Sequence, residues 1–207
     1  MSEKASLVAK ALTRSGALKF GSFKLRSGVS SPYYIDLSWL LSSPRDFECI
    51  VSIVAEEIRA LMSSKSIDKL ASIELKGALL LPSIANRLKL PCIIVRKEAK
   101  AYGLTGRITG GEVKKGERLI FFDDVVTSGD SKIEGIKPLE EAGGKIEAIL
   151  VVVDREQGGK QSLERQGYEV RSVTTISDLI KTLRSLGALS KEKVEQILEY
   201  LTKESHK

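Results

Sequence analysis

The chain has 207 residues, a formal net charge of +6, two cysteines and one histidine. Its length suits a single α/β domain, and no apolar run approaches the roughly 18 residues of a membrane-spanning helix. Two cysteines in apolar patterns fit neither a disulfide framework nor a zinc site, so we expect a reducing cytoplasm. The histidine, His206, lies in the polar tail, which excludes Ser-His and His-metal chemistry. The charged, amphipathic start of the chain is unlike a secretory signal.

The first forty residues predict a helix followed by a small hood. Apolar residues share one face of a helix over residues 4–15, and Gly16 ends it. Apolar and polar residues then roughly alternate up to residue 37, with a turn at Ser27-Gly28 and a strand at Tyr33-Tyr34-Ile35. We interpret this part as a hairpin-like hood of roughly residues 1–40. It precedes a core of roughly residues 41–207, within one domain of residues 1–207.

The core begins with alternating helices and strands. Ser43-Pro44 is a favourable helix start, and apolar residues follow the helical period up to Leu61. A strand over residues 69–74, a turn at Lys76-Gly77, a helix over residues 78–88 and a strand over residues 91–95 come next. This alternation predicts an α/β fold with a mainly parallel central sheet and helices on both faces.

A basic, glycine-rich segment follows. Residues 98–116 contain five glycines and little periodicity, which is typical of a long loop with a function or with mobility. Between Arg96 and Arg118 there are seven Lys or Arg residues and three acids, an excess of +4. The segment could bind nucleic acid, carry solvated charge or supply phosphate ligands. Nucleic acid is disfavoured because Tyr102 is the only interleaved aromatic residue and no helix-turn-helix or RNP-like pattern occurs.

The stretch from Arg118 to Ser131 is the most informative part of the chain. An apolar run ends in Asp123 and Asp124, and a short apolar step leads to Thr127-Ser128-Gly129 and a helical pattern. The N–H groups and dipole of a helix N-terminus suit a phosphate. The two carboxylates could hold sugar hydroxyls or a metal. The alternative is a buried strand followed by an ordinary polar helix cap.

The last third continues the α/β pattern. A strong strand over residues 146–153 ends in Asp154-Arg155, and a second strand is expected over residues 168–173. Two more helices are predicted: one that ends at Gly187, and a last one that is capped by Ser190. Because ligands bind at the carboxyl ends of parallel strands, we expect the segments that follow the strands to meet there.

The stretch around the two acids resembles the phosphoribosyl-pyrophosphate (PRPP) signature of the type I phosphoribosyltransferases. Three further segments are similar to orotate phosphoribosyltransferases in particular. They are LKFGSFKLRSGVSSPYYID, VRKEAKAYG and VVVDREQGG, at residues 18–36, 95–103 and 151–159. No GxxxxGK[ST] and no GxGxxG after a strand occurs, which argues against a P-loop hydrolase or a dinucleotide fold.

The resemblance implies a type I phosphoribosyltransferase fold and the reaction of orotate with PRPP, giving orotidine 5′-monophosphate and pyrophosphate in pyrimidine (UMP) biosynthesis. It implies Mg²⁺ held mainly by PRPP, pyrophosphate and water, with no direct protein ligand. It also implies a homodimer in which the loop around Lys100 reaches the neighbouring site. The catalytic residues would be Lys100, Asp123 and Asp124. The PRPP-binding residues would be Arg26, Lys76, Arg96, Lys97, Lys100, Tyr102, Asp123, Asp124, Val125, Val126, Thr127, Ser128, Gly129, Asp130 and Ser131. The orotate-binding residues would be Arg26, Tyr34, Ile35, Thr127 and Arg155.

Some positions depart from the family pattern. Arg26 stands where members usually carry lysine, and Tyr102 replaces the loop histidine, so that a titrating group near neutral pH is lost. Ile35 replaces an aromatic residue, and Asp130 puts an anion inside the phosphate loop. Two alternatives stay open: a PRPP-binding regulator of the same fold, and a phosphoribosyltransferase for another nucleobase. Membranes and nucleic acids are not expected as partners.

Overall fold

The computed structural model describes residues 3–24, 28, 30–100 and 106–204, and for Ala99 and Lys100 it describes the backbone alone. In this part of the chain, a six-stranded sheet has the order β5-β4-β3-β6-β7-β8. Its strands are β3 (Lys69–Ile73), β4 (Cys92–Lys100), β5 (Gly106–Thr109), β6 (Arg118–Val126), β7 (Lys145–Asp154) and β8 (Val170–Thr175). Neighbouring strands are parallel except β5, which is antiparallel to β4.

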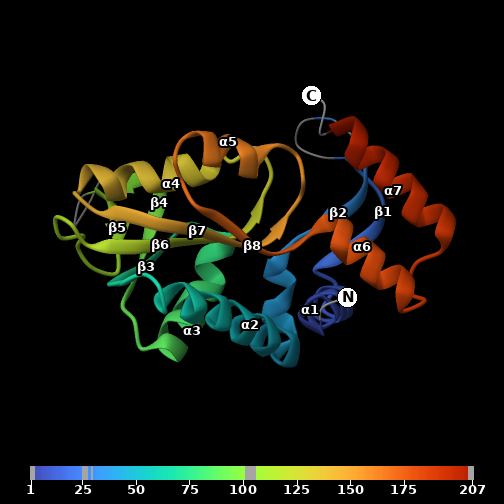
Figure 1. The fold of residues 1–207 in the computed structure, drawn as a ribbon, viewed down its shortest axis with the longest axis horizontal. Helices are drawn as coiled ribbons and strands as arrows, with labels where there is room; N and C mark the ends of the chain where they lie inside the picture. The colour runs from blue at the N-terminus through green and yellow to red at the C-terminus, as the bar shows by residue number, and fades with distance from the viewer. Residues whose placement is uncertain (1–2, 25–27, 29, 101–105, 205–207) are drawn as a thin grey trace.

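Helices cover both faces of this sheet, as predicted (Figure 1). On one face lie α4 (Asp130–Glu141) and α5 (Gly159–Arg165), and on the other lie α2 (Pro44–Met62) and α3 (Lys76–Leu88). The strand β6 shows why both faces must be covered. Ile120 and Phe122 pack in one core cluster, Phe121 packs in the other, and all three are fully buried. Alternate side chains of this apolar run point to opposite faces of the sheet, so a helix must cover each face.

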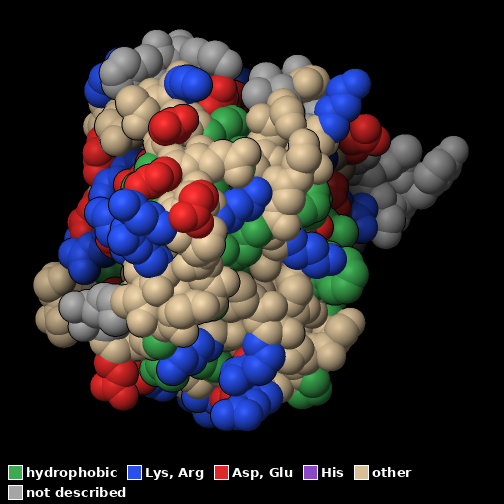
Figure 2. Space-filling model, turned by 90° about the vertical axis from the view of Figure 1, so that its right-hand side faces the viewer, with side chains coloured by type: hydrophobic (Ala, Val, Ile, Leu, Met, Phe, Trp, Pro, Cys, Tyr) green, Lys and Arg blue, Asp and Glu red, His purple; other side chains and the backbone are tan. Residues whose placement is uncertain are grey.

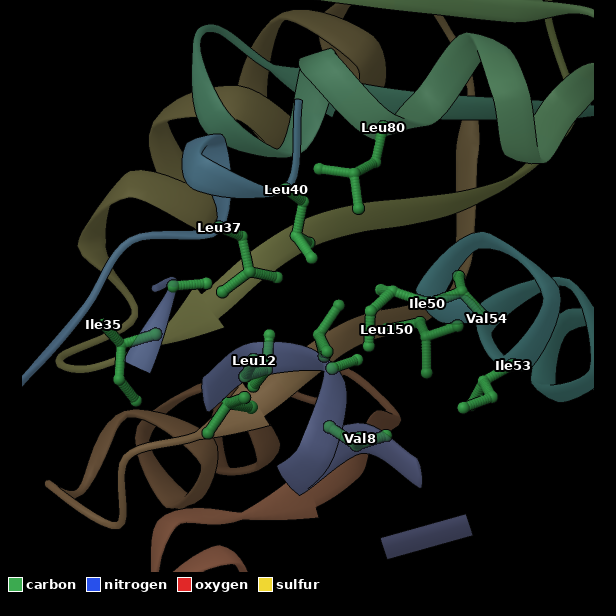
Figure 3. Packing of buried hydrophobic residues seen from close by; sticks show 14 of the residues in the cluster. Val8, Leu12, Ile35, Leu37, Leu40, Ile50, Ile53, Val54, Leu80 and Leu150 are labelled. Carbon is green, nitrogen blue, oxygen red and sulfur yellow. The ribbon is translucent and has the colours of Figure 1, made fainter. Parts of the chain in front are cut away.

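The hood is built from both ends of the chain. Its antiparallel strands are β1 (Leu18–Lys24) and β2 (Ser30–Ile35), followed by the short helix η1 (Leu37–Ser42). Helices α1 (Glu3–Arg14), α6 (Ile176–Ser185) and α7 (Lys191–Glu204) lie on the same side of the molecule (Figure 1). Leu12 of α1 and Ile35 of β2 reach the core cluster that also holds Leu150 of β7 (Figure 3). The hood therefore shares its core with one face of the central sheet.

Three elements lie where no regular structure is predicted, and one of them is the short helix η1. β5 and the last three residues of β4 fall inside the segment predicted as a loop, so this prediction is wrong for residues 98–100 and 106–109. The helix α5 follows the Gly158-Gly159 turn directly. In β5, Ile108 pairs with Val95 of β4, and Thr109 pairs with Ile94. The hydrogen bonds that hold β5 come from the neighbouring strand β4. The hydrophobic periodicity of the segment itself therefore does not predict this strand.

The charge on the hood side is divided among separate patches. On the face that corresponds to the right-hand side of Figure 1, Lys and Arg side chains form separate clusters, with acids and hydrophobic side chains between them (Figure 2). A continuous basic stripe, as expected for a nucleic-acid groove, is not seen on this face. Within the described residues, no helix combines the length and apolar character that a bilayer span requires.

Candidate active site

Three neighbouring strands of the sheet bring the candidate residues to one edge. Lys76 begins α3 after β3, Asp123 and Asp124 lie near the carboxyl end of β6, and Arg155 follows β7. Because β3, β6 and β7 are adjacent and parallel, their carboxyl ends lie side by side. Arg155 donates its backbone N–H to the carbonyl of Val126 at 3.1 Å, which joins the segment after β7 to the end of β6. The meeting point predicted from the strand ends is thus present.

The two acids are buried but differently engaged. Asp123 and Asp124 have exposed fractions of 5% and 4%. Asp123 Oδ1 accepts the backbone N–H of Asp124 at 2.9 Å, and Asp124 Oδ1 accepts that of Val125 at 2.8 Å. Asp124 Oδ2 is buried and has no hydrogen-bond partner among the described residues. Asp124 therefore has one oxygen to offer to a bound hydroxyl or cation.

A lysine that the sequence analysis does not single out neutralises part of this charge. Lys132, on the first turn of α4, has an exposed fraction of 4%, and its Nζ lies 2.6 Å from Asp123 Oδ2. The same ammonium group donates to the carbonyl oxygen of Val125 and, at 3.2 Å, to Ser131 Oγ. Burial, and then the charge of Asp123, raise the pKa of Asp124 to about 7, while Lys132 acts in the opposite direction.

The loop between β6 and α4 has the form of an anion-binding turn. Gly129 has a φ of 95°, and α4 begins at the next residue. This left-handed conformation suits glycine and turns the first N–H groups of the helix toward the loop. Ser128 Oγ donates to Asp130 Oδ2 at 2.8 Å, so the exposed Asp130 carboxylate is held by a hydroxyl of its own loop. Val126 is fully buried, whereas Val125 and Thr127 are half-buried, so Val126 offers its backbone alone to a ligand.

The start of α5 supports this loop from behind. A Cβ on Gly159 would clash with the backbone of Thr127 and would lie 2.8 Å from the carbonyl carbon of Ser128. Only glycine lets the two backbones approach this closely. Gly159 of the DREQGG segment thus has a packing role beside the turn between β6 and α4, which its sequence pattern does not reveal.

Lys76 is held on the other side by the hood. Its Nζ lies 3.1 Å from Asp36 Oδ2 and 5.9 Å from the ring centre of Tyr34, whose hydroxyl donates to the same carboxylate oxygen at 3.4 Å. Burial raises the pKa of Asp36, but hydrogen bonds from Ser38 and the pair with Lys76 outweigh it and lower this pKa overall. Tyr34, 37% exposed, is the open aromatic side chain here. Ile35 is 6% exposed and packs in the hydrophobic core, so toward a ligand it offers only its backbone.

Arg155 is placed by two tyrosines. Its Nε donates to Tyr33 Oη at 3.5 Å, and its guanidinium carbon lies 5.2 Å from the centre of the Tyr33 ring. Tyr200 of α7 packs edge-on against that ring, with 6.0 Å between the ring centres. Burial raises the pKa of Tyr33 despite the nearby guanidinium, so this hydroxyl stays protonated. Arg155 Nη2 is buried and unpartnered in the described part of the chain, as is Tyr200 Oη. Asp154 accepts the N–H of Glu156 at 2.8 Å rather than the arginine side chain.

The basic segment after β4 is described in part. The N–H of Lys97 donates to Glu74 Oε1 at 2.7 Å, and the carbonyl of Arg96 accepts from Arg107 Nε at 2.7 Å. Arg96 and Arg107 line a cavity of about 700 Å³ between β5 and the end of α4, away from the acid pair. The side chain of Lys100 and all of Arg26 and Tyr102 lie outside the described residues, so their expected roles stay predictions.

The comparisons with known proteins agree with this geometry. Residues 45–189 match the phosphoribosyl transferase domain family. The orotate phosphoribosyltransferase of Pyrococcus abyssi is 36% identical over 172 residues, which make up 83% of this chain and 93% of that protein. This chain belongs to the orotate phosphoribosyltransferase family. The family member from Pyrobaculum aerophilum is 34% identical over 194 residues, covering 93% of this chain and 97% of the relative.

Solved structures of a UMP synthase and of an orotate phosphoribosyltransferase have the same fold. The Leishmania donovani UMP synthase structure matches with a TM-score of 0.85 and 33% identity, over 98% of this chain and 43% of that chain. The orotate phosphoribosyltransferase structure from Aeropyrum pernix matches with a TM-score of 0.73 and 29% identity, over 88% of this chain and 99% of that chain. The type I phosphoribosyltransferase fold and the family suggested by the motifs are therefore confirmed.

Proposed function

We propose that the protein transfers the 5-phosphoribosyl group from PRPP to orotate, giving orotidine 5′-monophosphate and pyrophosphate on the route to UMP. In this reaction the bond between C1′ and the pyrophosphate oxygen breaks, the bond between C1′ and N1 of orotate forms, and the proton of N1 is released. Positive charge builds on the ribose and negative charge on the leaving group, so positioning and electrostatic stabilisation are what the protein must supply.

Each part of the site has a role in that scheme. The turn from Thr127 to Ser131 at the start of α4 would hold the 5′-phosphate with backbone N–H groups. The acid pair would hold the ribose hydroxyls and favour the developing cation. Lys76, with Lys100 from the basic loop, would balance the charge of the leaving pyrophosphate, whereas Arg96 lines the separate cavity described above. Mg²⁺ would enter with PRPP as a substrate complex and neutralise part of the pyrophosphate charge. Among the described residues, no group of three His, Cys, Asp or Glu side chains is arranged to hold a metal on its own.

One observation carries the choice of orotate over other bases. Arg155 has a buried, unpartnered Nη2 and is joined through its backbone to Val126, at the end of the strand that carries the acid pair. A guanidinium held with a free N–H group suits a carboxylate on the base, and orotate carries one where purines and uracil do not. The exposed ring of Tyr34, which has a ring centre 5.6 Å from that of Phe23, supplies a flat apolar surface for a pyrimidine.

The assay follows orotate absorbance with protein, Mg²⁺ and PRPP. We expect loss of absorbance that depends on PRPP, and no product with adenine, hypoxanthine or uracil. In Arg155→Met the KM for orotate should rise about 100-fold while the affinity for PRPP stays within about twofold. Turnover of a purine base without loss of orotate would contradict the proposal. Binding of PRPP without turnover of any base would favour a regulator of the same fold instead.

We further propose a homodimer in which the loop around Lys100 reaches the neighbouring site. Exposed apolar side chains near the site support a protein contact there: Trp39 and Leu41 on η1 are 47% and 52% exposed, and Leu75 beside Lys76 is 64% exposed. Large exposed apolar side chains are enriched at protein–protein interfaces. Light scattering at micromolar concentration should give twice the mass of the chain, and a monomer would contradict this part.

The free Cys49 and Cys92 are consistent with the cytoplasm as the compartment.

A further inference from the structure

Lys132 is an unusual residue for its place in the fold. It belongs to the first turn of α4, where its helix neighbour Ile136 points into the core, and its own exposed fraction is 4%. Lysine is among the residues least often buried, and burial of its charge is costly unless that charge is paired. Here the partner is Asp123, which is equally buried, at 2.6 Å between Nζ and Oδ2.

The burial of this pair does not by itself explain its presence. A buried ion pair commonly contributes no more to the free energy of unfolding than apolar residues of similar volume would. The acceptors of Lys132 suggest another role. They are Asp123, the carbonyl oxygen of Val125 and the hydroxyl of Ser131, and all three belong to the segment assigned above to the ribose and phosphate of PRPP.

We propose that Lys132 is a positioning residue for phosphoribosyl transfer. It ties the end of β6 to the first turn of α4, holds Asp123 by one oxygen, and leaves Asp124 as the acid with a free oxygen for the ribose. This inference rests on the proposed function. It divides the two adjacent acids into one that is locked and one that is available.

The charges around the acid pair support this division. Asp124 is faced by Asp123 on its own strand, by Lys132 from α4 and by Lys76 from α3, and Lys76 is itself paired with Asp36. Its Oδ2 has no partner among the described residues, whereas both oxygens of Asp123 are engaged. Loss of the Lys132 charge would disfavour the ionised form of Asp124. A variant without this charge would therefore need a higher pH to bind PRPP. It would also lose the contact that fixes the position of Asp123.

The test compares Lys132→Met with Lys137→Met, a control on the exposed side of the same helix, where the lysine side chain is 73% exposed. PRPP binding is measured by calorimetry between pH 6 and pH 9, and orotate turnover in the same range. We expect Lys132→Met to weaken PRPP binding at pH 7 by about tenfold or more. The acid limb of the plot of PRPP affinity against pH should move upward by about half a pH unit. Lys137→Met should match the parent protein. A Lys132→Met protein whose binding and acid limb are unchanged, or whose loss only follows its folded fraction in urea, would overturn the proposal.

A double-mutant cycle keeps the test decisive if Lys132→Met folds poorly. Asp123→Asn and the pair Asp123→Asn with Lys132→Met remove the buried charges in turn. If Lys132 acts through Asp123, the double variant should bind PRPP no more than about twofold more weakly than Asp123→Asn. Multiplied losses would show that Lys132 acts independently and would overturn the proposal. Because calorimetry needs no base, it tests Lys132 even if the parent protein fails to turn over orotate, an outcome that would count against the proposed function alone.

Discussion

Gly77, on the first turn of α3, lies directly against Asp123 at the end of β6. A Cβ at Gly77 would come within 2.5 Å of Asp123 Oδ1, 2.7 Å of Ser72 Oγ and 2.8 Å of the Cα of Asp123. Two of these atoms belong to the acid that Lys132 holds, and one of them is backbone that cannot turn away. The position of α3, and with it that of Lys76, is therefore coupled to the geometry of the acid pair.

We predict that Gly77→Ala lowers both turnover and stability. The added methyl group must push α3 away from β6, and overpacking of this kind costs about 1–3 kcal/mol of unfolding free energy. Turnover should fall further than the folded fraction does, because Lys76 and Asp123 move apart. Urea unfolding and the orotate assay measure the two effects. Gly21→Ala is the matched control, since there a Cβ would meet only the ring of Phe23, at 3.3 Å, and side chains can move. Wild-type turnover in Gly77→Ala would show that the close approach is not needed.

Asp124→Asn should make stability less dependent on pH. The folded-state pKa of Asp124, about 7, lies above that of an unfolded aspartate, so the folded protein binds this proton more tightly. The stabilising effect of that proton is complete below the unfolded pKa and is lost as the pH rises through about 7. Asparagine cannot ionise. The free energy of unfolding of Asp124→Asn, relative to that of the parent protein, should therefore rise by on the order of 2 kcal/mol between pH 5.5 and pH 8. Urea unfolding at the two pH values measures this difference. Parallel stability curves would indicate that Asp124 titrates as an ordinary aspartate.

Hybrid dimers can show whether the loop that carries Lys100 acts in the active site of its own subunit or in that of the neighbouring subunit. Lys100→Ala and Asp124→Asn should each be inactive as pure proteins. If Lys100 acts across the interface, a mixed dimer has one site with both defects and one site with none. Co-expression of equal amounts should then restore about a quarter of the wild-type activity, since half of the dimers are mixed. Activity is measured on the co-purified mixture. If Lys100 serves its own subunit, every site of a mixed dimer carries one defect and no activity should return.

The C-terminal helix should affect the binding of the base and not that of PRPP. Tyr200 of α7 supports Tyr33, which in turn holds Arg155. Tyr200→Leu should raise the KM for orotate by about three- to tenfold through a looser guanidinium, with the PRPP affinity unchanged. Tyr200→Phe keeps the ring and should stay close to the parent protein, because Tyr200 Oη has no partner in the described residues. Equal losses for both substrates in Tyr200→Leu would point to general destabilisation instead.

The parts of this protein that could be predicted are those that are continuous in sequence. The strand before Asp123, the two acids, the Thr-Ser-Gly turn and the helix after it occupy one segment, and local patterns are enough to identify each of them. The same is true of the family motifs and of the alternation that implies a parallel sheet. Backbone propensity and a short spacing carry this information, so it can be read without knowing which distant residues are neighbours.

The engagement of each side chain depends on contacts between distant segments. Tyr33 and Arg155 are 122 positions apart, and nothing local to either predicts that they meet, or that Tyr200 of the last helix packs against Tyr33. The inward side of β2 takes Ile35 into the core and leaves Tyr34 facing Lys76, a choice made by the packing of the hood on the sheet. Lys132 looks like an ordinary charged helix residue until α4 is placed against β6. Burial and ion pairing come from three-dimensional neighbours, and so the division of labour between Asp123 and Asp124 emerges only when the chain is folded.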